Sequence, residues 1–168
     1  MLRGGDRLGN SAMNWNPQTV LNDFKAVAGL AGIQLADRHI TIELLPAPHV
    51  APARLPGGKM AVYVFSRGDE VLKVGKVGPN SHARYSYQHY KAGSAMSTLA
   101  GSLLADKALS DLAEIDPSAV GAWIKGNIDR VNFIVDASLG IHVLTLLEAF
   151  LQCRLMPRYE GFQSQRTG

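Results

Sequence analysis

Two short runs of β-forming residues, joined by a tight turn, dominate the middle of this chain. Residues 60–65 and 71–77 are rich in valine, and the segment 67–70 between them contains a glycine and an aspartate, which favour turns. Two runs joined this closely predict an antiparallel β-hairpin. Gly78 and Pro79 follow directly, and proline cannot continue the hydrogen-bonding ladder of a central strand. We therefore expect the hairpin to form the centre of a globular domain.

Helices and a third strand are expected after the hairpin. Ser81 is a favourable N-cap, so a helix is predicted to begin there. Residues 131–136 contain valine, phenylalanine and isoleucine and predict a strand. The helices expected in this part of the chain cover residues 81–91, 95–108, 116–123 and 140–155.

Residues 1–56 are predicted to form an N-terminal extension. After a glycine-rich start, Asn16 and Pro17 are typical of the first residues of a helix, whose apolar spacing continues to Gly32. Residues 39–45 alternate as a strand does, and a proline-rich linker or ordered arm follows. We therefore divide the chain into this extension and a second domain, residues 57–168.

The composition excludes several classes of protein. The chain is 46% hydrophobic with a net charge of only +3, which excludes an intrinsically disordered protein. The single cysteine, Cys153, excludes a disulfide scaffold and a cysteine-based zinc site, and it indicates a reducing, cytoplasmic compartment. No apolar stretch approaches the roughly 18 residues that a membrane-spanning helix needs. We therefore expect a cytoplasmic protein that does not act on a membrane.

Positive charge is concentrated around the hairpin. Residues 54–91 contain seven lysines and arginines against two acids, a net charge of +5. Tyr85, Tyr87 and Tyr90 lie beside two histidines within the same segment. Cations interleaved with aromatic rings suit nucleic acid, because cations bind phosphates and rings stack on bases. A solvated helix whose tyrosines cover the core is the simpler alternative.

Glu148 is an isolated acid on an apolar helix. Leucines lie four residues before it and three residues after it, so its carboxylate projects from the face that should pack on the sheet. A carboxylate is costly there unless it is paired or binds a metal ion. A head group that reaches water from the edge of the apolar face is the alternative.

Tyr63, Lys73 and Arg84 would place a phenol and two cations near the hairpin and the helix after it. Together with Glu148, such groups can cleave a phosphodiester. They supply a base for water, cations for the developing charge and an anchor for one divalent ion.

In their order along the chain, these residues resemble the GIY-YIG nuclease superfamily. The resemblance covers residues 60–161 and rests on Val62-Tyr63-Val64-Phe65, Lys73-Val74-Gly75-Lys76, Arg84 with its neighbours, Leu-Leu-Glu148-Ala-Phe-Leu151 and Met156-Pro-Arg-Tyr159. It implies an α+β fold, an α/β sandwich in which a small three-stranded antiparallel sheet is flanked by helices. It also implies an endonuclease that cleaves nucleic acid, with DNA favoured over RNA and Mg²⁺ or Mn²⁺ as cofactor.

The resemblance also assigns roles to individual residues. Tyr63 would act as the general base or orient the attacking water, Lys73 and Arg84 would stabilise the charge on the phosphate, and Glu148 would bind the metal. The nucleic-acid-binding residues that we expect are Gly75, Lys76, Tyr85, Tyr87, His89 and Lys91.

The sequence departs from the superfamily pattern at two positions. Lys73 replaces the tyrosine of the second tripeptide, a substitution known within the superfamily. Glu160 stands near the place of the usual asparagine and is a candidate for a further acid near the metal. Because Tyr63, Arg84 and Glu148 are all retained, we expect an active enzyme.

Other functions are compatible with the same residues. The same scaffold could serve as a non-catalytic nucleic-acid-binding or regulatory protein, or could cleave RNA. The basic hairpin could instead contact a protein partner. A homodimer would suit an enzyme that cuts both strands, although nothing in the sequence shows one.

Overall fold

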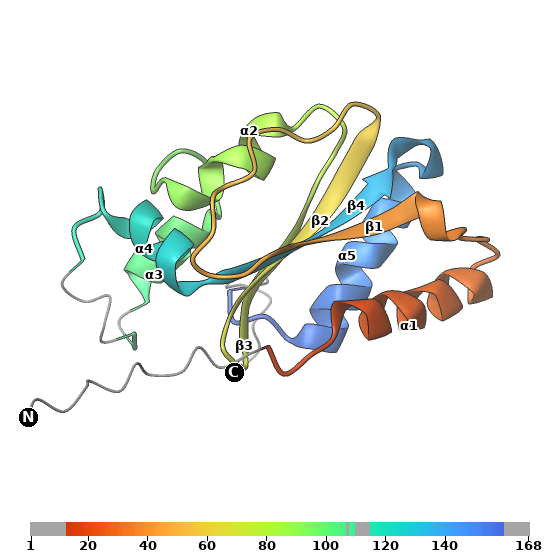
Figure 1. Ribbon diagram of the computed structural model, residues 1–168, viewed down its shortest axis with the longest axis horizontal. Coiled ribbons are helices and arrows are strands. Elements are labelled where there is room, and N and C mark those ends of the chain that lie inside the picture. The colour runs from red at the N-terminus through yellow and green to blue at the C-terminus, as the bar shows by residue number, and fades with distance from the viewer. Residues whose placement is uncertain (1–12, 107, 110–114, 160–168) are drawn as a thin grey trace, which may run out of the picture.

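The computed structural model describes residues 13–106, 108–109 and 115–159. In these residues, five α-helices and a four-stranded antiparallel sheet form an α+β fold (Figure 1). The strands are β1 (Ile40–Leu45), β2 (Lys59–Arg67), β3 (Glu70–Val77) and β4 (Asp129–Asp136), in the order β1-β4-β2-β3. The α-helices are α1 (Pro17–Leu30), α2 (His82–Ser86), α3 (Leu99–Ala105), α4 (Val120–Asn127) and α5 (Ile141–Leu155). The 3₁₀ turns are η1 (Asp37–His39), η2 (Gln88–Tyr90) and η4 (Ala137–Leu139).

The sheet has four strands, so the expectation of three is corrected. The additional strand is β1, which belongs to the predicted N-terminal extension and pairs with β4 from Ile40↔Val135 to Leu45↔Arg130. The alternation of residues 39–45 did predict this strand, but not its place in the main sheet. Without β1, the backbone groups on one side of β4 would lack their partners in the ladder. The predicted boundary at residue 56 therefore falls between two strands of one sheet.

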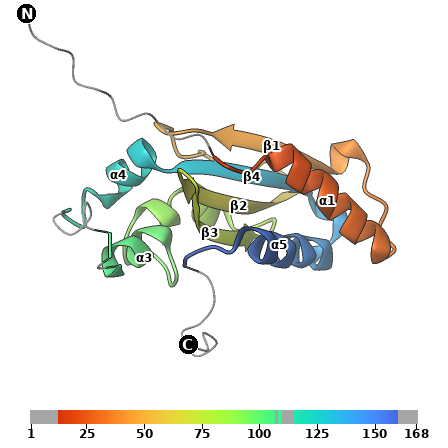
Figure 2. The same ribbon diagram turned by 90° about the horizontal axis from the view of Figure 1, so that it is seen from below.

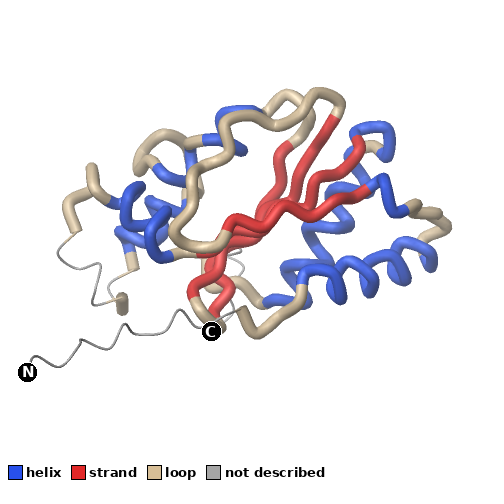
Figure 3. The backbone as a smooth tube through the Cα atoms, in the orientation of Figure 1, coloured by secondary structure: helices blue, strands red, loops and turns tan. Residues whose placement is uncertain are grey.

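Helices cover both faces of the sheet (Figures 2 and 3). Helices α1 and α5 pack on one face, where the rings of Phe24 and Phe150 lie 5.6 Å apart between centroids. Residues of α2, α3 and α4 pack on the other face. The central strand β2 is buried along most of its length, because both of its faces are covered. None of the helices in the described residues has the length and apolar character needed to cross a membrane.

The proline-rich segment between β1 and β2 is an ordered arm. Leu55 is fully buried, and the backbone N–H of His49 donates to the carbonyl of Lys125 on α4 at 2.9 Å. Ser86 on α2 also donates to the carbonyl of Ala53 at 3.0 Å. The arm therefore packs against the helices that follow the hairpin.

The predicted hairpin is confirmed, and it contains a β-bulge that matters for the site. Tyr63 pairs with Gly75 and Phe65 pairs with Lys73, but the next pair is Ser66 with Val71. One residue of β3, Leu72, is therefore extra. Because paired residues share a face of the sheet, Lys73 lies on the same face as Tyr63 and Gly75.

Two predicted helices are shorter than expected. The helix predicted over 81–91 ends at residue 86, and η2 follows, which buries the side chain of His89. The helix predicted over 95–108 begins only at Leu99, because Ser97 adopts a left-handed φ of 55° and Thr98 caps the helix. Four other elements begin and end within about two residues of their predicted limits: β2, β3, β4 and α5. This difference is within the usual uncertainty of such boundaries.

Candidate active site

Tyr63 and Arg84 are in direct contact at the centre of the candidate site. Tyr63 comes from β2 and is 1% exposed, and Arg84 comes from α2. Nε of Arg84 donates a hydrogen bond to Oη of Tyr63 at 3.2 Å. The structure therefore brings together the phenol and the guanidinium predicted to act on a phosphate.

Gly75 is the reason that the Tyr63 ring can take this position. The ring lies across the backbone of Gly75 on the neighbouring strand. A Cβ atom at residue 75 would lie 2.6 Å from Cζ of Tyr63 and closer still to its hydroxyl oxygen. Gly75 is therefore required by close packing inside the fold, since any other residue would push the phenol away from Arg84.

Lys73 joins this group through Ser97. Nζ of Lys73 donates to Oγ of Ser97 at 3.1 Å and to the carbonyl of Tyr159 at 3.4 Å. The two terminal nitrogens of Arg84 donate to the carbonyls of Met96 and Ser97 at 3.3 and 3.4 Å. One dipeptide thus holds both cations. Sequence reasoning missed it, because any residue can offer a carbonyl and no spacing rule marks a supporting loop.

His89 lies beneath Tyr63 rather than at the surface. It is fully buried, and its ring centroid is 4.4 Å from that of Tyr63. Nδ1 accepts a hydrogen bond from the backbone N–H of Leu99 at 3.2 Å, whereas Nε2 has no partner among the described residues. Burial lowers the pKa of His89 to about 2, and the positive charge of Arg84 adds to the effect. The imidazole is therefore neutral at physiological pH.

The remaining predicted nucleic-acid-binding residues separate into surface and core. Tyr87 is 54% exposed and Lys91 is also exposed, so both can contact a large partner. Tyr85 is buried, and its hydroxyl donates to the carboxylate of Glu43 at 2.8 Å. Burial is the main cause that raises the pKa of Tyr85. In this conformation neither Tyr85 nor His89 offers a free ring face for stacking on a base.

Arg130, which the sequence did not single out, is a buried cation behind the site. Its guanidinium lies 5.0 Å from the ring centroid of Tyr85 and 5.1 Å from that of Phe65. It donates to Oδ1 of Asn132 at 2.8 Å and to the carbonyl of Tyr85 at 2.8 Å. The strand predicted from the sequence begins at residue 131, directly after Arg130. The sequence therefore marked Arg130 only as a cation next to a strand.

Glu148 lies on the other side of β3 from Tyr63. It belongs to α5 and forms an ion pair with Nζ of Lys76, and its side chain is 18% exposed. Lys76 directly follows Gly75, so the two residues point to opposite faces of the sheet. The structure therefore brings Tyr63, Arg84 and Lys73 together on one face, and it pairs Glu148 with Lys76 on the other. Both groups lie along β3, which is an edge strand of the sheet.

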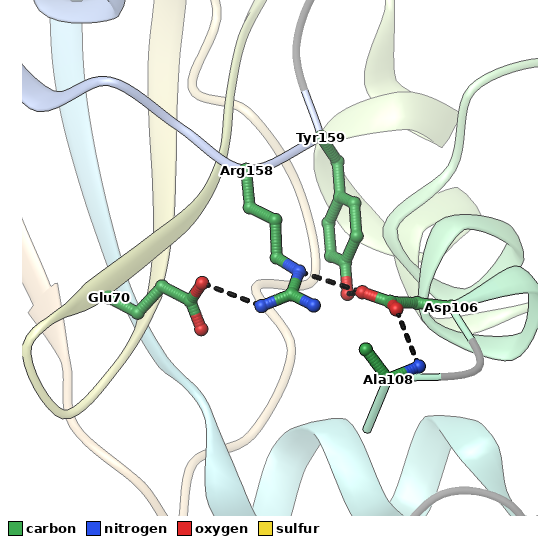
Figure 4. Close-up of polar contacts among 5 residues, drawn as sticks. All are labelled: Glu70, Asp106, Ala108, Arg158 and Tyr159. Atoms are coloured by element: carbon green, nitrogen blue, oxygen red, sulfur yellow. Dashed lines mark hydrogen bonds and ion pairs between the residues drawn. The ribbon is translucent and has the colours of Figure 1, made fainter. Parts of the chain in front are cut away.

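The residues after α5 are fixed to the same edge strand (Figure 4). The backbone N–H groups of Arg158 and Tyr159 donate to the carbonyls of Val71 and Leu72 at 3.0 and 2.9 Å. The Arg158 guanidinium forms ion pairs with Asp106 at 2.7 Å and with Glu70 at 2.8 Å. The Tyr159 hydroxyl also donates to Asp106, at 2.7 Å, and this bond is the main cause that lowers the pKa of Asp106.

This C-terminal segment carries the Tyr159 carbonyl that accepts from Lys73. Its attachment to β3 therefore helps to position that cation. Glu160, the candidate for a further acid, lies outside the described residues.

The described residues contain no group of three or more histidines, cysteines, aspartates and glutamates that could hold a metal ion. Glu148 would be a single carboxylate ligand. Mg²⁺ is often held by one or two carboxylates, with waters and substrate phosphates completing its coordination. The chemistry of Glu148 therefore fits a divalent ion of that kind, provided that Lys76 moves off the carboxylate.

A comparison with protein-family models, curated proteins and solved structures finds no match to this chain.

The packing of Tyr63 on Gly75 predicts a specific cost for Gly75→Ala. The added Cβ overlaps a buried ring, so we expect the free energy of unfolding to fall by about 1–3 kcal/mol. Gly78→Ala is the matched control, because a Cβ there meets no atom within 4 Å. Urea unfolding of both variants measures the difference. Equal stability of the two variants would show that the ring does not lie on Gly75.

Proposed function

We propose that this protein is a divalent-metal-dependent endonuclease that hydrolyses phosphodiester bonds in nucleic acid, with DNA favoured over RNA. The observation that carries the proposal is the contact between the Tyr63 phenol and the Arg84 guanidinium, with Lys73 held beside them through Ser97. A base and two cations at one place are suited to attack on a phosphate and to the negative charge that develops there.

Tyr63 would deprotonate or orient the attacking water. The hydrogen bond from Arg84 fixes the direction of the Tyr63 hydroxyl, so that its oxygen can orient a water molecule or accept a proton from it. The neutral His89 ring packs against the phenol and limits its movement. A base held in one rotamer by a glycine, an arginine and a histidine is preorganised for this task.

Arg84 would bind the phosphate oxygens, and Lys73, which is 2% exposed, would help to stabilise the developing charge from beneath the surface. The hydrogen bonds of Arg84 go to a phenol and to two carbonyls, which hold the guanidinium in place without neutralising it. A guanidinium has five N–H groups, so some remain for a phosphate. Exposed Tyr87 and Lys91 would contact the strand on either side.

Glu148 would hold one Mg²⁺ or Mn²⁺ ion, which would neutralise charge on the phosphate. The carboxylate of Glu148 on α5 pairs with Lys76 of the edge strand β3 in the free protein. A phosphate entering at the edge of β3 could accept Lys76 as a counter-ion, which would leave Glu148 free for the metal. Lys76 would then bind nucleic acid, as the sequence predicted.

Plasmid nicking tests the proposal directly. We expect the protein to nick supercoiled DNA in Mg²⁺ or Mn²⁺ but not in EDTA, and Glu148→Ala to reduce the rate by at least about 100-fold. Asp23→Ala is the control, because Asp23 lies on α1 and forms a partly exposed ion pair with Arg154. Cleavage by Glu148→Ala at the unmodified rate would contradict the proposal. So would the absence of any cleavage of duplex DNA, single strands and RNA.

A non-catalytic nucleic-acid-binding protein on the same scaffold is the second candidate. The observation that favours it is the Lys76–Glu148 ion pair, which neutralises the acid that a metal would need. This function predicts binding that weakens as salt increases, because phosphate contacts release counterions. It also predicts that Glu148→Ala binds normally while no variant cleaves.

The ion pair predicts that Lys76 competes with a metal ion for Glu148. Because partly exposed ion pairs contribute up to about 1 kcal/mol, we expect Lys76→Met to raise the affinity for Mn²⁺ by up to about fivefold. Electron paramagnetic resonance of free Mn²⁺ measures this affinity without nucleic acid. Lys59→Met is the control, because it removes the ion pair of Lys59 with Asp136 and leaves Lys76 and Glu148 unchanged. An unchanged or lower affinity in Lys76→Met would contradict the competition.

A further inference from the structure

Met96 is an exposed apolar residue whose backbone contacts the candidate site. It is 87% exposed, yet its carbonyl accepts a hydrogen bond from Nη1 of Arg84 at 3.3 Å. The next residue, Ser97, accepts hydrogen bonds from both Arg84 and Lys73. An exposed apolar side chain is therefore carried by a residue whose backbone contacts Arg84, the cation that would bind a phosphate.

The backbone that carries Met96 is fixed by buried neighbours. Ser97 has a left-handed φ of 55°, and the buried Thr98 caps α3 by accepting from the N–H of Gly101 at 3.0 Å. The N–H of Leu99 donates to the buried His89 ring at 3.2 Å. The position of Met96 relative to Arg84 is thus set by the packing of α3 rather than by a free loop.

The surroundings of Met96 favour nucleic acid over a protein partner. The Met96 carbonyl accepts from one cation and the next residue contacts a second one, so the partner that this loop suits is an anion. A phosphate bound to Arg84 brings its own sugar and base within reach of a long side chain. Methionine is flexible and polarizable, and it is one of the side chains that enter between stacked bases.

We propose that Met96 inserts between neighbouring bases of the strand whose phosphate binds Arg84. The inference rests on the proposed function and adds to it the kind of substrate, which is a strand that unstacks at the position of cleavage. Such steps open at low cost in single strands, at mismatches and at flexible pyrimidine–purine steps. Tyr87, which is 54% exposed and follows Arg84 by three residues, offers a ring for the displaced base.

A fluorescent adenine analogue that brightens when it is unstacked tests the proposal. Short DNA single strands and duplexes carry it at successive positions, and the full chain is added at low salt in EDTA so that no strand is cut. The anisotropy of an end label reports binding in the same samples. We expect the unmodified protein to raise the emission several-fold at one position and Met96→Ala to lose most of that rise with little change in affinity.

Two variants serve as controls. Met96→Leu keeps an apolar side chain of similar size and should keep the rise in emission. Met156→Ala removes another exposed methionine, 79% exposed and located just after α5, and should leave the rise unchanged. This pattern would support the proposal.

Other outcomes would overturn it in distinguishable ways. If Met96→Ala brightens the analogue as strongly as the unmodified protein at equal occupancy, the insertion of Met96 between bases is wrong. The proposed nuclease function is not affected by that result. If a strand binds but the emission of the analogue rises at no position, the insertion of Met96 is also wrong and the nuclease function is again not affected. If no strand binds at low salt, the insertion of Met96 and the proposed function both fail.

Discussion

The packing of the Tyr63 ring on Gly75 is the contact on which the candidate site depends. It requires the hairpin register that pairs these two residues, and it requires a residue without a Cβ on the edge strand. The ring then points its hydroxyl at Arg84 on the next helix. The bulge at Leu72 places Lys73 on the same face. A change in this register by one residue would put the phenol and the lysine on opposite faces of the sheet.

The charged side chains around this contact differ in whether an opposite charge is paired with them. Arg84 is held by a phenol and by carbonyls, and the buried Arg130 lies among aromatic rings and neutral hydrogen-bond acceptors. Glu148 is on the opposite face and is paired with Lys76. These contacts therefore position Arg84 and Arg130 without neutralising them. Such an arrangement would suit the polyanion of the proposed function, and the divalent ion that Glu148 would bind would have to displace Lys76 first.

The sequence allowed part of this arrangement to be predicted. The hairpin and the helix after it were evident from local patterns, so Tyr63, Lys73 and Arg84 could be placed near one another. The partner of β1 was not evident, because an alternating strand does not indicate which neighbour it joins. The ion pair between Lys76 and Glu148 joins residues 72 positions apart, which no local pattern could indicate. The support from Ser97 uses a carbonyl and a hydroxyl in an irregular loop, and the bulge that orients Lys73 leaves no mark in the sequence.

The central claim is that the phenol of Tyr63 takes part in hydrolysis of a phosphodiester. The most direct test is a single-turnover measurement of DNA cleavage by Tyr63→Phe in Mg²⁺, with binding measured in parallel. The account predicts that cleavage slows by at least about 100-fold while the affinity for DNA is unchanged, because the ring still packs on Gly75. Cleavage by Tyr63→Phe at the rate of the unmodified protein would contradict it.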